Sequence, residues 1–357
     1  MKVLLLGFAR IATMPYMVDY VHLLKDSHKL HLVSWNRSGK PDLPAPDGVE
    51  KSFVFSDHVE DEDPLPSKLP HIVRYRRFVR RIIQQERYDK IAVLHSTPGI
   101  ALFDILKRNY RGRYLLDYRD VSHENLGFYR SLIADLANNA GLIIASSPAF
   151  FQYLGGPSEV ILKHNLLFEE EPKTLRRDRR VIRVRYWGMI RHEAATLALI
   201  DEIGGDERFE LHYNGREEIV AKRLKAHVAG RGYTNVFFHG SYYNGERPFF
   251  AADTDLIHNV YENDFATKGA MGNKYYDGIQ FKIPQLCTAG SIMGEMVSEK
   301  GLGLAIDYSK PGFAEAIFDY LQDIDYALFD EACAKELRSV EKDNERANEA
   351  ILRFFEC

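Results

Sequence analysis

Short apolar runs alternate with helical patterns through the first half of the chain. The runs begin with KVLLLGF at 2–8 and HKLHLVSW at 28–35, and they continue at 90–96, 114–120, 141–147 and 159–165. Because these runs are continuous, we expect strands that are buried on both faces, as in a parallel sheet. The alternation of strands and helices predicts successive βαβ units.

The second half of the chain repeats this pattern after a charged, proline-containing stretch at 168–185, which we predict to be an interdomain linker. Further apolar runs follow at 181–188, 209–215, 235–240, 254–261 and 285–290, and the chain from about Gly312 onward has a helical pattern. We therefore predict an α/β fold with two Rossmann-like domains facing across a cleft. The predicted divisions are an N-terminal domain at 1–170, a C-terminal domain at 181–310 and a helical tail at 311–357, for which we also consider packing against the N-terminal domain.

Composition narrows the class of protein. The chain has 357 residues, of which 45% are hydrophobic and 27% are charged, as in ordinary globular proteins of more than one domain. The net charge of −4 gives little support for binding to nucleic acid. Cys287, Cys333 and Cys357 form no CxxC pair, so we expect neither a disulfide framework nor a zinc site, and a cytoplasmic location fits this cysteine usage. No apolar run approaches the roughly 20 residues of a spanning helix, so any membrane contact would be peripheral.

The segment NKYYDGIQFKIPQL at 273–286 carries the most informative polar cluster. Asn273, Lys274, Tyr276 and Asp277 open a short predicted helix that ends before a proline-marked strand. The helix N-terminus and Lys274 could hold a diphosphate, and the Asp277 carboxylate could accept hydrogen bonds from ribose hydroxyls. The alternative interpretation is a helix cap with solvated charges.

This segment resembles the donor-binding stretch of the GT-B retaining glycosyltransferases of family 4, in which a Lys, an aromatic residue and a Glu precede a helix and a Gly-Lys-Pro turn. Asp277 stands at the position of that Glu, and Gly269 stands where the family has a second Glu. The segment at 186–192, YWGMIRH, is similar to the family's first C-terminal strand and its Gly-Arg loop. The resemblance implies that Gly188 and Arg191 meet the donor, with Arg191 clamping the diphosphate. A solvated loop arginine is the alternative.

The resemblance also implies an acceptor side in the N-terminal half. Asp120 ends a predicted strand and could take the proton of an acceptor hydroxyl or stabilise positive charge at the anomeric carbon; alternatively it pairs with Arg119 or caps the next helix. His95 also follows a strand, and it could orient substrate hydroxyls or shuttle a proton, or be purely structural.

The loop with Gly7, Phe8 and Arg10 resembles the family's N-terminal loop. It lacks the GxGxxG fingerprint, which disfavours NAD binding.

Between residues 71 and 85 an amphipathic helix is predicted. Arg74, Arg77 and Arg81 lie opposite its apolar stripe, which consists of Ile72, Tyr75, Val79, Ile82 and Ile83. This arginine face could meet anionic lipid head groups, although a solvated face is the usual role of such a charge run.

Together these features predict a glycosyltransferase that moves a sugar, of the hexosyl type, from a nucleotide-sugar donor to a glycan or glycolipid acceptor in cell-surface polysaccharide synthesis. Retention of configuration is implied by the resemblance alone. No DxD motif stands out, so we expect no metal or other cofactor, with Arg191, Lys274 and helix dipoles at the diphosphate. The alternatives are a sugar-nucleotide epimerase or hydrolase of the same fold, and an inactive binding protein, for which Gly269 is the motivating observation.

Overall fold

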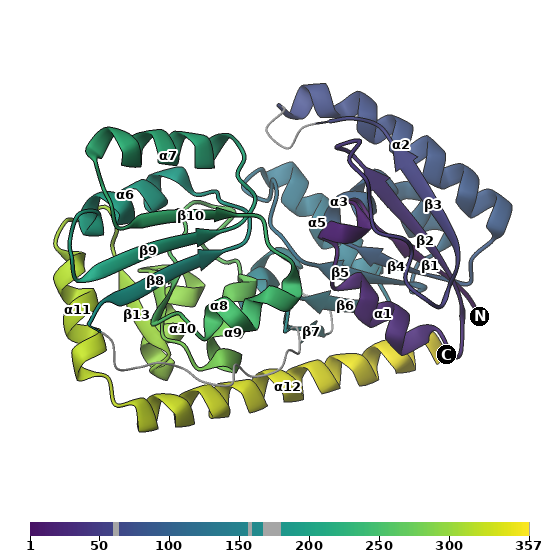
Figure 1. The fold of residues 1–357 in the computed structure, drawn as a ribbon. Coiled ribbons are helices and arrows are strands. Elements are labelled where there is room, and N and C mark those ends of the chain that lie inside the picture. Colours follow the sequence, from purple (N-terminus) through teal and green to yellow (C-terminus); the bar gives the residue numbers. More distant parts are fainter. Residues whose placement is uncertain (60–63, 156–158, 167–179, 357) are drawn as a thin grey trace. The chain divides into compact units, whose positions relative to one another are not determined.

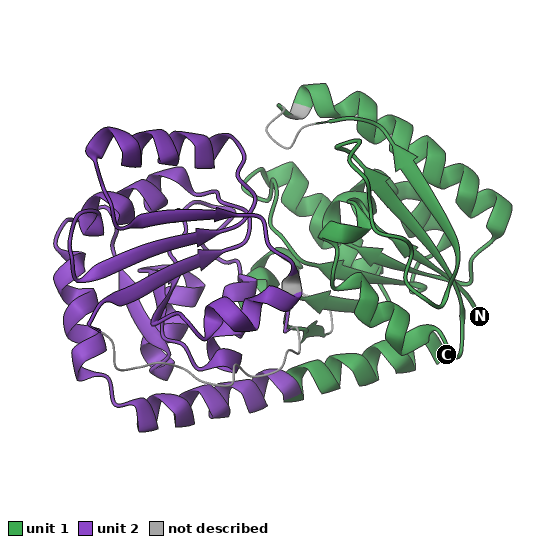
Figure 2. Cartoon of the chain, in the orientation of Figure 1, with its two compact units in different colours: residues 1–164, 342–357 green, residues 165–341 purple. Residues whose placement is uncertain are grey.

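The computed structural model describes residues 1–59, 64–155, 159–166 and 180–356, which form two compact units (Figures 1 and 2). Unit 1 comprises Met1–His164 and Lys342–Cys357, and unit 2 comprises Asn165–Glu341. Each unit is built around one sheet in which all paired strands run parallel.

Unit 1 contains a seven-stranded sheet in the order β3-β2-β1-β4-β5-β6-β7. Its strands are β1 (Lys2–Leu6), β2 (Lys29–Asn36), β3 (Val49–Ser56), β4 (Lys90–Leu94), β5 (Tyr114–Tyr118), β6 (Leu142–Ala145) and β7 (Val160–Leu162). Its helices are η1 (Ile11–Thr13), α1 (Met17–Leu24), α2 (Leu65–Glu86), α3 (Ser96–Ala101), α4 (Phe103–Asn109), α5 (Gly127–Asn139) and η2 (Pro148–Tyr153).

The interior strands of unit 1 are buried on both faces because helices cover each face of the sheet. Residues of α1 pack with the apolar side chains of β1, β2, β4 and β5 in one core cluster. On the other face, α3 approaches the sheet so closely that a Cβ at Gly99 would meet Val93 of β4 and Leu136 of α5. The continuous apolar runs of the sequence are therefore interior strands, as a parallel sheet requires.

Unit 2 contains a six-stranded sheet in the order β10-β9-β8-β11-β12-β13. Its strands are β8 (Ile182–Trp187), β9 (Phe209–Asn214), β10 (Val236–Gly240), β11 (Leu256–Asn259), β12 (Gln285–Thr288) and β13 (Gly303–Ile306). Its helices are α6 (Glu193–Ile203), α7 (Ile219–Arg231), η3 (Asn244–Glu246), α8 (Arg247–Ala251), α9 (Asn273–Phe281), α10 (Ile292–Lys300), α11 (Phe313–Asp323) and the first part of α12 (Tyr326–Glu356). Helices α6, α7 and α11 pack on one side of the sheet, and α9, α10 and α12 form a second apolar cluster.

Helix α12 contributes to both cores (Figure 2). Phe329, Cys333 and Val340 lie in the cluster with α9 and α10 of unit 2. From Lys342 onward the helix belongs to unit 1, where Ile351 and Phe355 pack against β1, β2 and α1. The core of unit 1 is thus built from two segments that are far apart in the sequence.

The structure confirms the predicted α/β fold class, and each predicted apolar run contains one of the strands. Strands β3 and β13 were not predicted. Helix α2 confirms the predicted amphipathic helix at 71–85. Most of the predicted linker lies outside the described residues, and residues 182–185 at its end belong to β8. Cys287 and Cys333 are buried free thiols, and Cys357 lies outside the described residues.

Candidate functional site

In both sheets the strand order reverses beside the first strand, between β1 and β4 in unit 1 and between β8 and β11 in unit 2. The loops that follow such a pair of strands leave a crevice in which ligands of parallel sheets bind. Gly7, Phe8 and His95 follow the first pair, and Gly188 and Arg191 follow β8. Each unit therefore has a candidate site of its own.

The loop between β8 and α6 has an unusual backbone. Gly188 has φ 121°. A Cβ on the neighbouring Gly215 would overlap the Gly188 carbonyl oxygen, so the two loops touch at their backbones. His192, the residue before α6, adopts the left-handed conformation with φ 63° and ψ 57°. Such a conformation is uncommon for a residue with a side chain and persists where the surrounding structure requires it.

Lys274 on α9 is a buried cation. Its ammonium nitrogen donates a hydrogen bond to the Tyr261 hydroxyl at 3.0 Å, and it lies 4.0 Å from the centre of the Tyr186 ring. Only 5% of the residue is exposed. Burial lowers the pKa of Lys274, and the positive charge of Arg191 lowers it further. The Asp277 carboxylate raises this pKa in turn, but the direct contacts of the ammonium group are a hydroxyl and aromatic rings, which compensate a buried charge less than a paired carboxylate does.

Arg191 and His192 lie near Lys274. Arg191 is exposed, and its charge lowers the pKa values of both His192 and Lys274. The His192 ring stacks on Tyr261 with centroids 4.5 Å apart. Burial, Arg191 and Lys274 together lower the pKa of His192 to about 3, so this imidazole is neutral at physiological pH. Its Nε2 atom is buried and accepts or donates no hydrogen bond among the described residues.

Asp277 is committed to contacts within unit 2. Its carboxylate accepts a hydrogen bond from the Trp187 indole at 2.7 Å and pairs with the Arg247 guanidinium at 3.1 Å. The residue is 4% exposed, so neither Asp277 nor Lys274 is a solvated surface charge. The predicted contact of Asp277 with ribose stays a prediction, and in this structure the carboxylate orders Trp187 and Arg247.

The other predicted donor-side residues differ in exposure. Asn273 is exposed at the first position of α9, whereas Tyr276 is buried. Gly269 lies in the turn before this helix. At the start of α6, the backbone N–H of Ala194 donates to the Glu262 carboxylate at 2.9 Å. This helix N-terminus is therefore occupied by an anionic group, as its partial positive charge favours.

The two catalytic candidates of unit 1, His95 and Asp120, lie near each other. His95 ends the turn after β4 with φ 132°, and its Nδ1 atom accepts a hydrogen bond from the Thr97 N–H at 3.2 Å. The neutral imidazole therefore carries its proton on Nε2, which lies 3.7 Å from a carboxylate oxygen of Asp120. Arg119 pairs with the buried Asp117 at 2.6 Å, a contact that the sequence interpretation had assigned to Asp120 as an alternative.

The loop after β1 brings Gly7 and Phe8 to this region but directs Arg10 elsewhere. A Cβ at Gly7 would lie within 2.9 Å of Met14 and the Val33 carbonyl, so only glycine fits without a shift. Phe8 contacts the ring of Trp35 with centroids 4.7 Å apart. Arg10 donates to the carbonyl oxygen of Pro41 at 3.0 Å and is absent from the residues that line the cavity described next.

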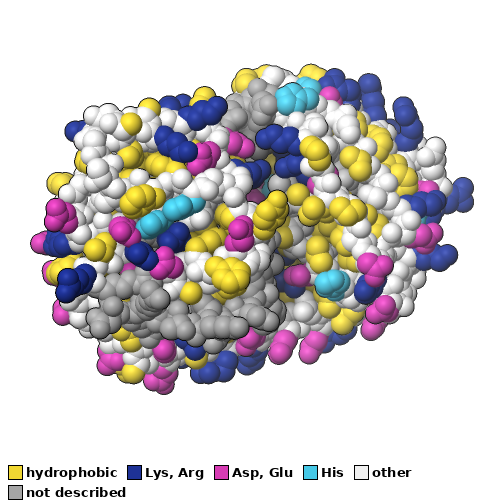
Figure 3. Space-filling view, in the orientation of Figure 1, with side chains coloured by type: hydrophobic (Ala, Val, Ile, Leu, Met, Phe, Trp, Pro, Cys, Tyr) yellow, Lys and Arg dark blue, Asp and Glu magenta, His cyan; other side chains and the backbone are white. Residues whose placement is uncertain are grey.

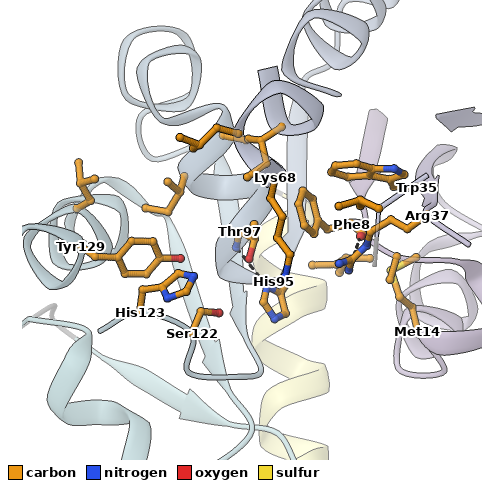
Figure 4. Close-up of a pocket in the computed structure, with 18 of the residues that line it drawn as sticks. Phe8, Met14, Trp35, Arg37, Lys68, His95, Thr97, Ser122, His123 and Tyr129 are labelled. Carbon is orange, nitrogen blue, oxygen red and sulfur yellow. Dashed lines mark hydrogen bonds between the residues drawn. The ribbon is translucent and has the colours of Figure 1, made fainter. Parts of the chain in front are cut away.

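A cavity of about 560 Å³ occupies the carboxyl edge of the unit 1 sheet (Figure 4). Apolar side chains from six segments make most of its wall, among them Phe8, Met14, Trp35, Ile72, Leu94 and Ile100. His95, Thr97, Ser122 and His123 lie together on one side, as Figure 4 shows. Asp120 does not line the cavity among the described residues.

Two of the three arginines predicted to form a basic face on α2 make no ion pair with described residues. These are Arg77 and Arg81, whereas Arg74 pairs with Asp57 at 2.7 Å. Within the described residues, no helix is both long and apolar enough to cross a membrane. In the same part of the chain, no group of three or more His, Cys, Asp or Glu side chains is arranged to hold a metal ion.

Sequence reasoning did not single out the aromatic partners of this site, Tyr186, Trp187 and Tyr261, nor Arg247. Tyr186 and Trp187 end β8, and Tyr261 follows β11, so their positions after paired strands were the available signal. Arg247 comes from α8, and nothing local in the sequence connects it with Asp277, 30 residues away.

No family model matches the chain, and no curated protein matches it. The chain does match solved structures. Sucrose-phosphate synthase from Thermosynechococcus elongatus superimposes with a TM-score of 0.74 at 12% identity, covering 99% of both chains. HepE from Anabaena, solved in complex with UDP and glucose, has a TM-score of 0.69 at 18% identity over 98% of this chain and 99% of that chain. WaaG, a glycosyltransferase involved in lipopolysaccharide biosynthesis, has a TM-score of 0.66 at 12% identity over 98% and 99%.

These matches extend over nearly the whole chain and therefore include both of its sheets. At these levels of identity they establish the architecture, which agrees with the one that the sequence resemblance implied. The chain has the GT-B fold of the group 1 glycosyltransferases, with one Rossmann-like sheet in each unit.

Proposed function

We propose that this protein is a glycosyltransferase whose unit 2 binds the diphosphate of a nucleotide-sugar donor. The observation that carries this proposal is the buried ammonium group of Lys274, which has a hydroxyl and two aromatic rings as contacts and Arg191 beside it. Two neighbouring positive charges repel each other, and burial of one of them adds a desolvation cost. A diphosphate that sits between them would compensate both charges.

The chemistry follows from this charge arrangement. Transfer breaks the bond between the anomeric carbon and the diphosphate and forms a bond to an acceptor oxygen. The leaving group gains negative charge in the transition state, and Arg191 and Lys274 would stabilise it without a metal ion. The acceptor hydroxyl would pass its proton to Asp120, because the lone pair on Nδ1 of His95 is already used by the Thr97 N–H. His95 would then position the Asp120 carboxylate through Nε2–H.

Two finer assignments come from the sequence resemblance. They are retention of configuration and a glycan or glycolipid acceptor in cell-surface polysaccharide synthesis. The ligands of two similar structures support a uridine diphosphate sugar as the first donor to test, since HepE was solved with UDP and glucose and an E. coli trehalose-6-phosphate structure with UDP-2-fluoroglucose.

The test is calorimetric titration of the full chain with UDP and other nucleoside diphosphates, in the presence and absence of EDTA. We expect binding that EDTA does not change and that Lys274→Met weakens by roughly 30-fold to 150-fold, because a hydrogen bond to a charged group contributes about 2–3 kcal/mol. Lys222→Met on α7 is the matched control, since this exposed lysine lies on a different helix. Equal binding by both variants would contradict the proposal.

Lys274→Met also separates function from folding. Replacement of a buried, poorly compensated charge by an apolar side chain is often neutral or stabilising. We therefore expect the free energy of unfolding to stay the same or to rise while nucleotide affinity falls.

Incubation of the donor without an acceptor distinguishes the rival reactions. Epimerised or stoichiometrically released sugar in that mixture would identify an epimerase or hydrolase, and nucleotide binding without turnover would identify a binding protein.

For the membrane contact proposed for Arg74, Arg77 and Arg81, flotation with anionic vesicles should exceed flotation with neutral ones.

A further inference from the structure

The cavity of unit 1 has the wrong lining for a glycan. None of the described residues that line it is Asp, Glu, Asn or Gln, the side chains whose oxygens accept hydrogen bonds from sugar hydroxyls. Arg37, Lys68 and several hydroxyl and imidazole groups also line the cavity, but most of its wall is apolar, so a glycan placed in it would leave many hydroxyls without a hydrogen-bond partner. An apolar ligand of ordinary size would instead gain from burial, and about 560 Å³ lies within the range of small-molecule sites.

The polar part of the lining has a defined place. His95 and Thr97 follow β4, and Ser122 and His123 follow β5, so these four residues form a polar group on one side of the cavity, whereas Arg37 lies beside Phe8 and Trp35 (Figure 4). The aromatic wall with Phe8 and Trp35 lies toward β1 and β2. A molecule with a hydroxyl-bearing head and an apolar tail matches this division, and its head would lie beside the His95 and Asp120 pair.

The mouth of the cavity is also apolar. Leu69 of α2 and Phe128 of α5 line the cavity and are 52% and 65% exposed. Exposed large apolar side chains at the rim of an apolar pocket are typical of a surface that receives an apolar partner. On the face drawn in Figure 3, hydrophobic side chains gather over unit 1, with Lys and Arg side chains along the part where α2 runs.

Helix α2 continues this surface away from the mouth. Leu69, Val73, Arg77 and Arg81 are spaced four residues apart, so each lies beside the next in a row that turns by about 40° around the helix at every step, and all four are exposed. The apolar pair is next to the cavity, and the two arginines follow one and two turns later. A face of this kind suits a lipid surface, where apolar side chains enter the acyl region and cations meet anionic head groups.

We propose that the acceptor is an amphiphile, and that its apolar chain occupies this cavity through the mouth at Leu69 and Phe128. This inference deepens the proposed function, because it selects lipid-linked acceptors over free glycans for the same transferase. The chain would enter from the side of α2, and the head would remain on the side of the cavity where His95 lies.

The test uses the full chain and the fluorescence of Trp35, which lines the cavity, whereas the only other tryptophan, Trp187, is buried in unit 2. The probe is decyl glucoside with bromine at the end of the chain, titrated below its micelle concentration. We expect saturable quenching of about half of the emission. A glucose tetrasaccharide without an alkyl chain should neither change the emission nor compete with the probe.

The variants place charge at the mouth. Leu69→Glu combined with Phe128→Glu should raise the dissociation constant of the probe at least tenfold, because the chain must pass two charged side chains. Phe151→Glu is the matched control, since Phe151 is 40% exposed in unit 1 and does not line the cavity. All three positions are exposed, and unchanged circular dichroism would verify folding.

Three results would overturn the inference: quenching that does not saturate, equal affinity in the double variant and the control, or competition by the tetrasaccharide. A different result would contradict the proposed function. If the chain binds the probe but no nucleotide, the proposed transferase function is wrong and the amphiphile site stands. If nucleotide binding depends on Lys274 and the probe does not bind, the chain is a transferase with a glycan acceptor.

Discussion

The two units have the same strand order and place their candidate sites at the same point of the sheet, yet the two sites differ in chemistry. In unit 2 the loops after β8 and β11 surround a buried cation with aromatic rings and a neutral imidazole. In unit 1 the loops after β1 and β4 surround a mostly apolar cavity. The architecture therefore fixes where a ligand lies, and the side chains of a few loops decide which ligand it is.

The largest expected effect comes from the buried ion pair between Asp277 and Arg247 in unit 2. Asp277→Ala would leave the Arg247 guanidinium buried without its carboxylate and the Trp187 N–H without its acceptor, and removal of one partner of a buried pair costs about 3–5 kcal/mol. We expect this loss in urea unfolding followed by Trp187 emission. Trp35 emission reports the unfolding of unit 1 and is the internal control. A loss of nucleotide binding without a loss of stability would contradict this expectation and show that Asp277 acts on the ligand.

Arg191→Ala tests whether both cations of unit 2 act on one ligand. Because Arg191 is exposed, its contact with a diphosphate is partly screened, and we expect nucleotide affinity to fall by roughly tenfold, about 1.4 kcal/mol. Unfolding should be unaffected. In calorimetry, the double variant with Lys274→Met should show a non-additive loss, whereas additive losses would place the two residues at separate ligands.

The pH dependence of stability should differ between the units. His192 in unit 2 has a folded-state pKa of about 3, below the value of 6.5 that it regains on unfolding. The unfolded state therefore binds the proton between these values, and stability falls as pH decreases from about 6.5 toward 3, by at most about 1.4 kcal/mol per pH unit for this histidine. His192→Gln should reduce the slope of urea-unfolding free energy against pH that is monitored by Trp187, and an unchanged slope would contradict the assignment.

The smallest effect is expected for Arg74 of unit 1, which is exposed and paired with a carboxylate, whereas Lys274 is buried. Arg74 pairs with Asp57 at the surface of α2, and such exposed ion pairs contribute little to stability because water and salt screen them. Arg74→Ala should change the urea midpoint of unit 1 by little, and it should leave probe binding in the cavity unchanged. A large loss of stability would mean that this pair holds α2 in place.

The sequence predicted the fold because interior strands of a parallel sheet are continuous apolar runs. Strand β3 escaped prediction because its sequence, VEKSFVFS, carries a charged pair and alternates between exposed and partly buried positions. Strand β13 was missed because GLAI is short and begins with glycine. Both are edge strands, which need less apolar surface than interior ones.

The candidate site was predictable only in part. Arg191 and Lys274 were found because charged residues after strands stand out against the apolar pattern, and the structure brings their charges together. The contacts of Asp277 with Trp187 and Arg247 were not predictable, since they join three separate segments. The apolar cavity of unit 1 was missed for the same reason, because it is assembled from loops and helices that share no local period.

The division of α12 between the two units has a consequence for biosynthesis. A ribosome completes all of unit 2 before it makes residues 342–356, although β1, β2 and α1 of unit 1 emerged long before. Until then, the surface that Ile351 and Phe355 will cover stays open to water and to other nascent chains. The N-terminal strands of unit 1 therefore cannot complete their core until the turns of α12 after Lys342 have been made, and we expect chaperones to bind this open apolar surface during synthesis.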